Sequence, residues 1–511
     1  MVLSSVNRFT QLDQHLRDLL ASTGSPGLAI AIFDRENTLF ERQFGFRDRE
    51  AELPITPDTI FGIASVTKSF TALTVLAQEA AGRLKLTDRI SAHLPLSLPG
   101  EPTLEHFLTH STGLPPAPTM TWIRIASQRG DPAAEAANLT EAKLTLANGA
   151  MGSTPNWRSV SCAELDLAAG QVPDEETWRR CSELTEQVGT PDGLCAWLQE
   201  HARPLFGAPG AVYSYSNDSF ALSGHVVERV SGRPFEEEVA RAVLTPLGMD
   251  RSTFDADKVV ADADHTTLYT RDKSGAVQPS PKWQTTGRML GGGMLKSTLN
   301  DLRKYVRYLM DPQRYSAPVP AERVVSMREG RVWSGPDERY GYGLAVNKLG
   351  GVTVVTHSGS LKGVSSVIGF SPELGIGVVG LCNLDGVPIS QILYPTFNAL
   401  MGAPLATRPY EPEAFSGSEP EARELLDELV GEYRSGEPYG RLIIEADGVT
   451  PRVRSGAPVA VEVPAVLIRR GELSVRMPMN NVAVTAHRDA DGNVVGVLAG
   501  SRVLWRTGTG G

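Results

Sequence analysis

The chain has 511 residues, of which 41% are hydrophobic and 21% are charged, a composition typical of a globular protein with a large core. The formal net charge of −10 and the pI near 5.5, without any basic tract, argue against a nucleic-acid-binding surface. No apolar run approaches the ~20 residues that a membrane-spanning helix needs. We therefore expect a protein that binds neither nucleic acid nor a membrane.

The N-terminal residues predict an amphipathic helix of the mature fold. Phe9, Leu12, Leu16 and Leu19 recur at helical spacing, and no basic start is followed by a continuous apolar core. Because the chain shows no signal peptide of that kind, we expect a cytoplasmic protein.

Two strands and two helices are predicted next. The apolar run at 27–33 and the run at 38–44 flank the turn sequence DREN, which favours a β-hairpin. Residues 65–81 are good helix formers and end before Gly82, a natural C-cap. A further helix is expected at 102–108.

Residues 116–205 differ in composition from their surroundings. They hold three of the four cysteines and four of the seven tryptophans, with helix-like pieces near 132–147, 174–187 and 191–202. The cysteines, at positions 162, 181, 195 and 382, form no C-x-x-C pair. We expect buried free thiols rather than a disulfide framework.

The second half of the chain changes from helices to strands. Helices are expected at 219–230, 234–247 and 298–309, and strands at 352–356, 365–370 and 375–381. This order predicts an α+β fold, in which a helical part packs on one antiparallel sheet.

The C-terminal part has a different pattern. Residues 403–420 are rich in Pro, Glu and Ser, as expected of a linker, and a short helix is expected at 421–430. Strands then recur about every eight residues, at 441–445, 459–463, 466–470, 473–477, 482–487 and 494–498. Such even spacing predicts a small antiparallel β-barrel or sandwich.

A serine and a lysine at helical spacing are the first candidates for chemistry. The sequence SVTK (65–68) holds the only lysine with a serine three positions before it, in a chain with ten lysines and thirty-nine arginines. On a helix, Ser65 and Lys68 share one face. A desolvated lysine can lose its proton and activate a serine, whereas arginine cannot. The motif alone also occurs by chance in many chains.

Two further motifs occur once each. The sequence YSN (215–217) offers a tyrosine that could relay a proton and an amide that could orient a carbonyl group. We expect Tyr213 and Tyr215 to share a face of one strand. The sequence HSG (357–359) ends an apolar strand, where Gly359 lets a substrate backbone approach and the N–H of Ser360 can donate.

Other polar features have simpler structural explanations. Gly291–Gly293 does not fit a phosphate-binding loop, so close backbone packing beside the site is the better interpretation. His110 lies beside a turn and is expected to be a structural hydrogen-bonding residue. The nine histidines are scattered without metal-ligand spacing, so no metal site is expected.

The ordered motifs SVTK, YSN and HSG resemble those of the serine β-lactamase, penicillin-binding protein and D-aminopeptidase superfamily. The stretches PDTIFGIAS, LTHSTGLP, GGGMLKSTLNDL and YGYGLAV add to the resemblance, which covers roughly residues 10–400. It implies a transpeptidase-like catalytic domain at 1–402, a linker at 403–420, and a lipocalin-like barrel at 421–511.

The resemblance also implies a role for each motif residue and no cofactor. Ser65 would form an acyl-enzyme, and Lys68 and Tyr215 would share the base and acid work. Asn217 would bind a substrate carbonyl. The backbone N–H groups of Ser65 and Ser360 would form an oxyanion hole, in which one donor stabilises the transition state by ~3–4 kcal/mol.

The chain departs from the family pattern at His357 and at 116–205. Where other members have the lysine of K-T-G, His357 would be a weaker anion holder that titrates near its reference pKa of ~6.5. The H-x-G element resembles the aminopeptidase, amidase and esterase branch. The segment 116–205 is longer than in compact members and is interpreted as a lid or wall over the cleft; an oligomer contact explains it equally well.

These motifs predict a serine hydrolase that cleaves an amide bond of a small peptide or amide. A carboxylesterase or acyl-transferase on the same scaffold stays open, as does a slowly deacylating penicillin-binding sensor. The expected partner is a small peptide, amide or ester substrate, and a homo-oligomer is left open.

Overall fold

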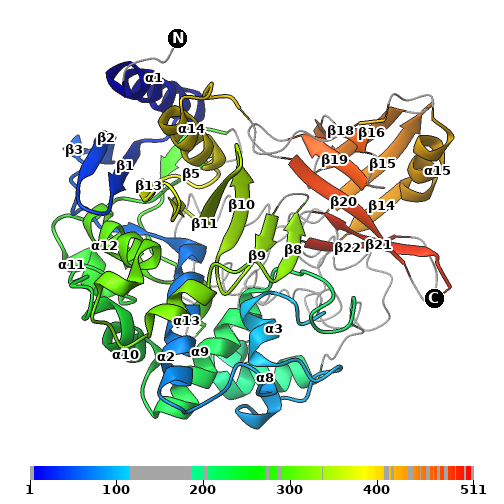
Figure 1. Cartoon of the computed structure of the whole chain (residues 1–511), viewed down its shortest axis with the longest axis horizontal. Helices are drawn as coiled ribbons and strands as arrows, with labels where there is room; N and C mark the ends of the chain where they lie inside the picture. The colour runs from blue at the N-terminus through cyan, green and yellow to red at the C-terminus, as the bar shows by residue number, and fades with distance from the viewer. Residues whose placement is uncertain are drawn as a thin grey trace.

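Figure 1 shows the computed structural model of the chain. The structure describes residues 5–114, 179, 183, 186–200, 205–271, 275–284, 289–335, 338–407, 414–415, 419–434, 441–448, 450–455, 461–463, 465–468, 472–476, 481–488, 491–499 and 502–507. The helices expected at 132–147 and 174–187 lie wholly or largely outside these residues, as do Cys162 and Cys181.

A nine-stranded antiparallel sheet forms the centre of the N-terminal part of the chain, residues 5–402, in the order β3-β2-β1-β13-β12-β11-β10-β9-β8. Its strands are β1 (Gly27–Asp34), β2 (Thr38–Asp48), β3 (Leu53–Pro54), β8 (Val332–Gly335), β9 (Glu338–Tyr340), β10 (Ala345–Leu349), β11 (Val352–Leu361), β12 (Val364–Ser371) and β13 (Ile376–Cys382). The predicted hairpin is confirmed, and β1 also pairs with β13, with Ala31 opposite Val379. The sheet thus joins the beginning and the end of this N-terminal part.

Helices cover both faces of this sheet, because its central strands are apolar on both sides. Ala29, Ala31 and Phe33 belong to one core cluster, together with residues of α2 (Thr67–Ala80), α9 (Asn217–Ser231) and α12 (Leu299–Met310). Leu28, Ile30 and Ile32 belong to a second cluster with α1 (Ser5–Thr23) and α14 (Ser390–Met401). In Figure 1, α1 and α14 lie side by side at the top of the sheet. The expected α+β class is confirmed.

Most predicted elements of the N-terminal part are present with shifted ends. The helix expected at 65–81 starts as the 3-10 helix η1 (Ala64–Val66) and continues as α2. The helix expected at 234–247 is α10 (Phe235–Val239), which continues into a wider π-helical turn at Ala240–Leu244. The remaining helices here are α3 (Leu104–Leu108), α8 (Pro191–Glu200), α11 (Ala256–Ala261) and α13 (Ala321–Ser326).

Two short strand pairs lie outside the two large sheets in the part of the chain that the structure describes. A pair formed by β4 (Phe61–Gly62) and β7 (Lys296–Ser297) leads into η1, and β5 (Tyr269–Arg271) pairs with β6 (Val277–Pro279). Phe61 lies opposite Ser297 in the first pair. The chain just before the S-x-x-K motif is therefore fixed by a local strand pair.

The C-terminal part is a second nine-stranded antiparallel sheet, in the order β17-β16-β15-β14-β22-β21-β20-β19-β18. Its elements are α15 (Pro420–Leu429), β14 (Gly431–Arg434), β15 (Arg441–Asp447), β16 (Thr450–Ser455), β17 (Val461–Val463), β18 (Ala465–Ile468), β19 (Glu472–Arg476), β20 (Asn481–Arg488), β21 (Val494–Ala499) and β22 (Arg502–Arg506). The sheet curls so that β16 approaches β18, giving a half-barrel around a core that includes Leu426, Val453 and Val497. The sequence pattern missed β14, β16 and β22.

Two further expectations can be compared with the structure. Cys195 and Cys382 are buried free thiols, as expected. Among the described helices, none combines the length and hydrophobicity that a membrane span requires.

Replacing a core residue of α1 tests whether this helix is part of the fold. Leu16 is fully buried, so Leu16→Ala should lower the free energy of unfolding by about 2–5 kcal/mol. The exposed Gln11→Ala on the same helix should change it by less than about 0.5 kcal/mol. Urea unfolding of both variants measures this, and equal stabilities would show that α1 does not contribute to the core.

Candidate active site

Ser65 and Lys68 meet at the start of α2. Ser65 is half-buried in the first turn of η1, where backbone N–H groups have no intrahelical acceptor. The side chain of Lys68 is fully buried, and its Nζ lies 3.2 Å from Oγ of Ser65. The predicted contact across one helical turn is present.

Two more oxygen atoms surround the amine of Lys68. Asn217, the first residue of α9, accepts a hydrogen bond at Oδ1 over 2.8 Å, and the backbone carbonyl of Gly292 accepts one over 2.5 Å. The structure thus brings the S-x-x-K and Y-x-N motifs together. Gly292 was not predicted as a site residue, because a backbone carbonyl leaves no signature in the sequence.

The three glycines at 291–293 allow this carbonyl to reach the amine. A Cβ atom on Gly291 would lie 2.4 Å from the carbonyl oxygen of Phe220 in α9, so only glycine fits there. Thr71 of α2 donates to the carbonyl of Gly291 over 2.8 Å. These glycines therefore provide close backbone packing between α2 and α9, as expected.

The H-x-G motif lies in β11, which passes directly beside η1. A Cβ atom on Gly359 would lie 2.3 Å from the carbonyl oxygen of Ile63 and 3.0 Å from Cβ of Ala64. Ala64 itself has a positive φ of 46°, a strained conformation for a residue with a side chain. The strand and the turn that carries Ser65 are thus held in contact, at some cost in backbone strain.

The edge of β11 beside Ser65 is open in the part of the chain that the structure describes. Pairing with β10 ends at Thr356, and beyond it the described chain places no strand on that side. A two-residue loop joins β11 to β12, and hydrogen bonding alternates along such a hairpin. Gly359 therefore bonds to β12, whereas Ser360 directs its N–H group to the open edge. The donor role of Ser360 in an oxyanion hole stays a prediction.

Tyr215 lies in a loop, not in the strand that the alternation of Tyr213 and Tyr215 predicted. The loop ends at Ser216, the N-cap of α9, whose hydroxyl accepts from the backbone of Ser219. The ring of Tyr215 faces Lys68, with Nζ 4.7 Å from the ring centroid. The capping serine between Tyr215 and Asn217 was the signal for a helix start.

His110 packs against this loop and bonds to its backbone. Its ring lies 4.2 Å from that of Tyr215, and Nδ1 accepts a hydrogen bond from the backbone N–H of Ser216 over 3.0 Å. Since Nδ1 accepts, it carries no proton in this arrangement. His110 is buried and structural, as its position beside a turn predicted.

His357 is neutral and bonded within the protein. Its Nδ1 lies 2.7 Å from the carbonyl oxygen of Ser358, which can only accept, so Nδ1 carries the hydrogen. Nε2 then accepts from the hydroxyl of Tyr340 over 2.8 Å. Burial raises the pKa of Tyr340 well above its usual value, so this hydroxyl keeps its proton.

The expectation that His357 titrates near 6.5 is therefore wrong. Burial and, second, the charge of Lys68 lower the pKa of His357 to about 3. Both ring nitrogens are engaged by Ser358 and Tyr340, so the imidazole is not a cationic anion holder near neutral pH. Tyr340 had no sequence signal, because its contact with His357 arises only when β9 and β11 lie in one sheet.

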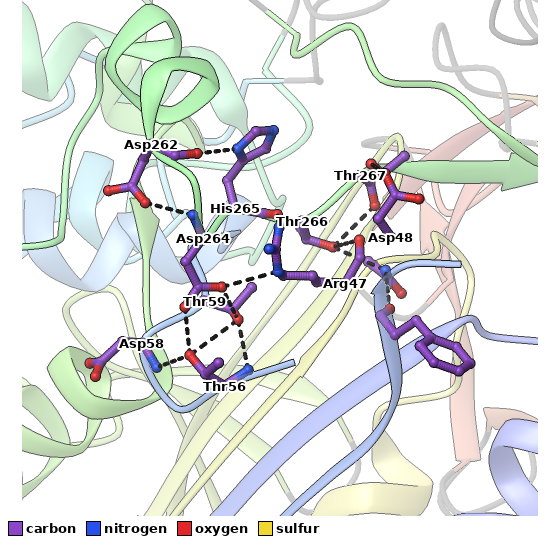
Figure 2. Close-up of polar contacts among 12 residues, drawn as sticks. Arg47, Asp48, Thr56, Asp58, Thr59, Asp262, Asp264, His265, Thr266 and Thr267 are labelled. Carbon is purple, nitrogen blue, oxygen red and sulfur yellow. Dashed lines mark hydrogen bonds and ion pairs between the residues drawn. The ribbon is translucent and has the colours of Figure 1, made fainter. Parts of the chain in front are cut away.

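Asp264 clamps the segment that leads to Ser65 (Figure 2). Its carboxylate accepts hydrogen bonds from the hydroxyls of Thr56 and Thr59, each over 2.6 Å. Its backbone carbonyl accepts from the N–H of Ile60 over 2.9 Å. The chain is thus fixed five residues before Ser65.

Within the described ranges, no group of three or more His, Cys, Asp or Glu side chains could hold a metal ion.

Comparison with known proteins agrees with this geometry. The family model Beta-lactamase matches residues 12–393, so the chain belongs to the beta-lactamase family of serine hydrolases. Protein flp of Staphylococcus aureus (strain MW2) is 24% identical over 389 residues, 75% of this chain and 64% of that protein. The chain thus spans less than two thirds of that relative. A beta-lactamase of Pseudomonas fluorescens is 25% identical over 409 residues, 73% of this chain and 92% of that protein.

Solved structures share the fold over nearly the whole chain. The octameric penicillin-binding protein homologue from Pyrococcus abyssi superposes with a TM-score of 0.62 at 24% identity, covering 97% of this chain and 99% of that one. SurE superposes with a TM-score of 0.61 at 17% identity, covering 98% of this chain and 100% of that one. At these identities the likeness concerns the fold, including the C-terminal sheet.

A methyl group at position 359 should separate β11 from η1. In Gly359→Ala the new carbon would collide with the backbone of Ile63 and with Oγ of Ser366, 2.5 Å away. We expect kcat/KM to fall on the order of 100-fold, and the free energy of unfolding to fall by about 1–3 kcal/mol. Ser358→Ala, at an exposed neighbour, is the control for both measurements. Normal activity in Gly359→Ala would refute the close approach.

His357 should make the protein less stable in acid. Its pKa is lowered from 6.5 to about 3, so between these values the unfolded chain binds a proton that the folded chain does not. Stability therefore rises with pH in this window, and His357 accounts for about 2 kcal/mol of the loss between pH 7 and pH 5. His357→Gln should remove that part of the loss. Urea unfolding at both pH values measures it, and an unchanged pH dependence would contradict the burial of a neutral His357.

Proposed function

We propose that this protein hydrolyses an amide bond of a small peptide or amide through an acyl-enzyme on Ser65. The observation that carries the proposal is the buried Lys68 amine, 3.2 Å from Oγ of Ser65 and bonded to two other oxygen atoms. A serine hydroxyl becomes a useful nucleophile only when a neighbouring base removes its proton.

The hydrogen-bond partners of Lys68 suit the role of the base that would remove the serine proton. A neutral amine has two hydrogens and one lone pair. The two hydrogens would be donated to the carbonyl of Gly292 and to Oδ1 of Asn217, which leaves the lone pair for the Ser65 hydroxyl. Attack by Oγ on the substrate carbonyl would then transfer the serine proton to Nζ.

Tyr215 would complete proton transfer to the leaving group. Its ring lies over Nζ of Lys68, so the two groups are direct neighbours. We assign Lys68 and Tyr215 together to general-base and general-acid work, which typically contributes about 10²–10⁴-fold to a rate. Asn217 uses Oδ1 for Lys68, so its NH₂ group is the part suited to a substrate carbonyl.

The oxyanion hole would be built from two backbone N–H groups. Ser65 supplies one from the first turn of η1, and Ser360 supplies the other from the open edge of β11. Gly359 brings the two segments together, since a Cβ there would contact Ile63 and Ala64. Both donors are fixed before the reaction begins, as electrostatic stabilisation requires.

The neutral His357 favours substrates without a carboxylate beside the scissile bond. A lysine at this position would attract such a carboxylate, whereas this histidine carries no charge near neutral pH and is bonded to Ser358 and Tyr340. We therefore favour an N-terminal residue of a short peptide, or a simple amide, over penicillins. A structure of SurE with D-Leu, which superposes with a TM-score of 0.59 at 17% identity, adds support for a D-residue.

The experiment is a comparison of initial rates on D-alanine p-nitroanilide, L-alanine p-nitroanilide and p-nitrophenyl acetate. Ser65→Ala should lower turnover on the order of 10⁴-fold or more, and Lys68→Ala by several orders of magnitude. Lys85→Ala, at an exposed lysine, is the matched control and should keep the wild-type rate.

Each outcome separates the alternatives. Amide cleavage that depends on Ser65 and favours the D-substrate supports the proposal. Ester cleavage alone would replace it with the esterase or acyl-transferase, leaving the nucleophile in place. A stable mass adduct without turnover would indicate the slowly deacylating sensor. Activity retained in Ser65→Ala would refute the nucleophile.

We further propose that 1–402 and 421–511 are separate domains joined by the linker 403–420. The two parts have separate core clusters, one set around the central sheet and one inside the curled sheet. We also propose a homo-oligomer, which the octameric homologue from Pyrococcus abyssi supports by its fold.

A further inference from the structure

Phe206, a residue of the N-terminal part, packs against the C-terminal sheet. Its side chain is 1% exposed, and its ring stacks on that of His487 with the centroids 3.6 Å apart. Trp505 meets the same ring edge-on at 4.8 Å. His487 belongs to β20 and Trp505 to β22, so residues of the C-terminal sheet enclose a side chain that precedes Tyr215 by nine residues.

A row of backbone hydrogen bonds runs from Phe206 towards the site. The N–H of Phe206 donates to the carbonyl of Gly113, that of Gly210 to Ser111, and that of Ser214 to His110, each over 2.7 Å. The segments 110–113 and 206–214 are therefore fastened along their length, although neither forms a strand.

The contact between these two segments is tight. A Cβ atom on Gly113 would lie 2.1 Å from the carbonyl oxygen of Gly207, so the backbones touch directly. A Cβ on Gly207 would lie 2.6 Å from Cγ2 of Val212. These close contacts couple the loop to the segment 110–113, so a displacement of Phe206 would be transmitted along this pairing.

The row ends at Tyr215. His110 receives the hydrogen bond of Ser214 at its carbonyl and that of Ser216 at Nδ1, and its ring lies 4.2 Å from the ring of Tyr215. The position of Tyr215 over Lys68 is thus set by the same residue that anchors the loop from Phe206.

We propose that Phe206 is a positioning residue, through which the C-terminal sheet holds Tyr215 in place for proton transfer with Ser65 and Lys68. This inference rests on the proposed function of Tyr215. The C-terminal sheet contributes to catalysis in this way without itself touching the reacting atoms. Removing the ring of Phe206, or its partner Trp505, should loosen the loop and move the tyrosine hydroxyl.

The test is a double-mutant cycle on the full chain. Phe206→Ala should lower kcat on the order of 10- to 100-fold with KM changed less than about threefold. In a Tyr215→Phe background the same substitution should lower kcat less than about twofold, because no hydroxyl is left to misplace. Phe206→Tyr, which keeps the ring, should restore most of the rate. Trp505→Ala should act like Phe206→Ala, and Arg488→Ala, an exposed neighbour of His487, should have no effect.

The outcomes distinguish this inference from the proposed function. An equal loss of kcat in both backgrounds, or no loss in the first, would overturn the role of Phe206 while Tyr215 keeps its own. If Tyr215→Phe leaves kcat unchanged, the role of Tyr215 fails and this inference fails with it. If Phe206→Ala does not fold, the cycle is carried out with Trp505→Ala, for which the same results support or overturn the inference.

Discussion

Lys68 places an amine in the interior of the protein, where an amino group without oxygen partners would cost roughly several kcal/mol. Three oxygen atoms surround this amine: Oγ of Ser65 on η1, Oδ1 of Asn217 on α9 and the carbonyl oxygen of Gly292. They come from three distant parts of the sequence. Satisfying one amine therefore brings Ser65, the side-chain amide of Asn217 and the glycine-rich turn into one place.

The second constraint is the contact between β11 and η1. A strand edge can serve as part of an acyl-transfer site only if its backbone reaches the nucleophile, and any side chain at position 359 would prevent this. Ala64 adopts a strained backbone conformation in the same contact. The strain is maintained by surroundings that fix the chain on both sides, among them the Asp264 clamp before η1 and the buried face of α2 after it.

The sequence predicted the parts of this candidate site that depend on residue type and order. Ser65, Lys68, Asn217 and Gly359 each carry a side chain, or the lack of one, that the proposed chemistry needs, so their spacing was informative. Gly292 and Tyr340 could not be found in this way. One acts through a backbone carbonyl, and the other meets His357 only through the pairing of strands remote from the motif.

The errors of the sequence interpretation have similar causes. Tyr215 was assigned to a strand because alternating tyrosines have the period of one, but the cap at Ser216 decides the local structure. The ionisation of His357 depends on burial, which no local pattern reports. In the C-terminal part, β14 and β16 were missed because each has few apolar positions, and β22 was missed because its apolar residues Val503, Leu504 and Trp505 are consecutive and do not alternate with polar ones. Their place in the sheet depends on neighbours rather than on intrinsic preference.

The pairing of β1 with β13 has a consequence for synthesis on the ribosome. Leu28 pairs with Cys382, so the apolar strand β1 emerges long before its partner exists. At about 5–20 residues per second, the interval amounts to roughly tens of seconds. During that time β1 can pair only with β2, and the helices translated in between must assemble without their sheet. The nascent chain thus presents an unfinished apolar edge for most of its synthesis, which exposes this hairpin to chaperones and to aggregation.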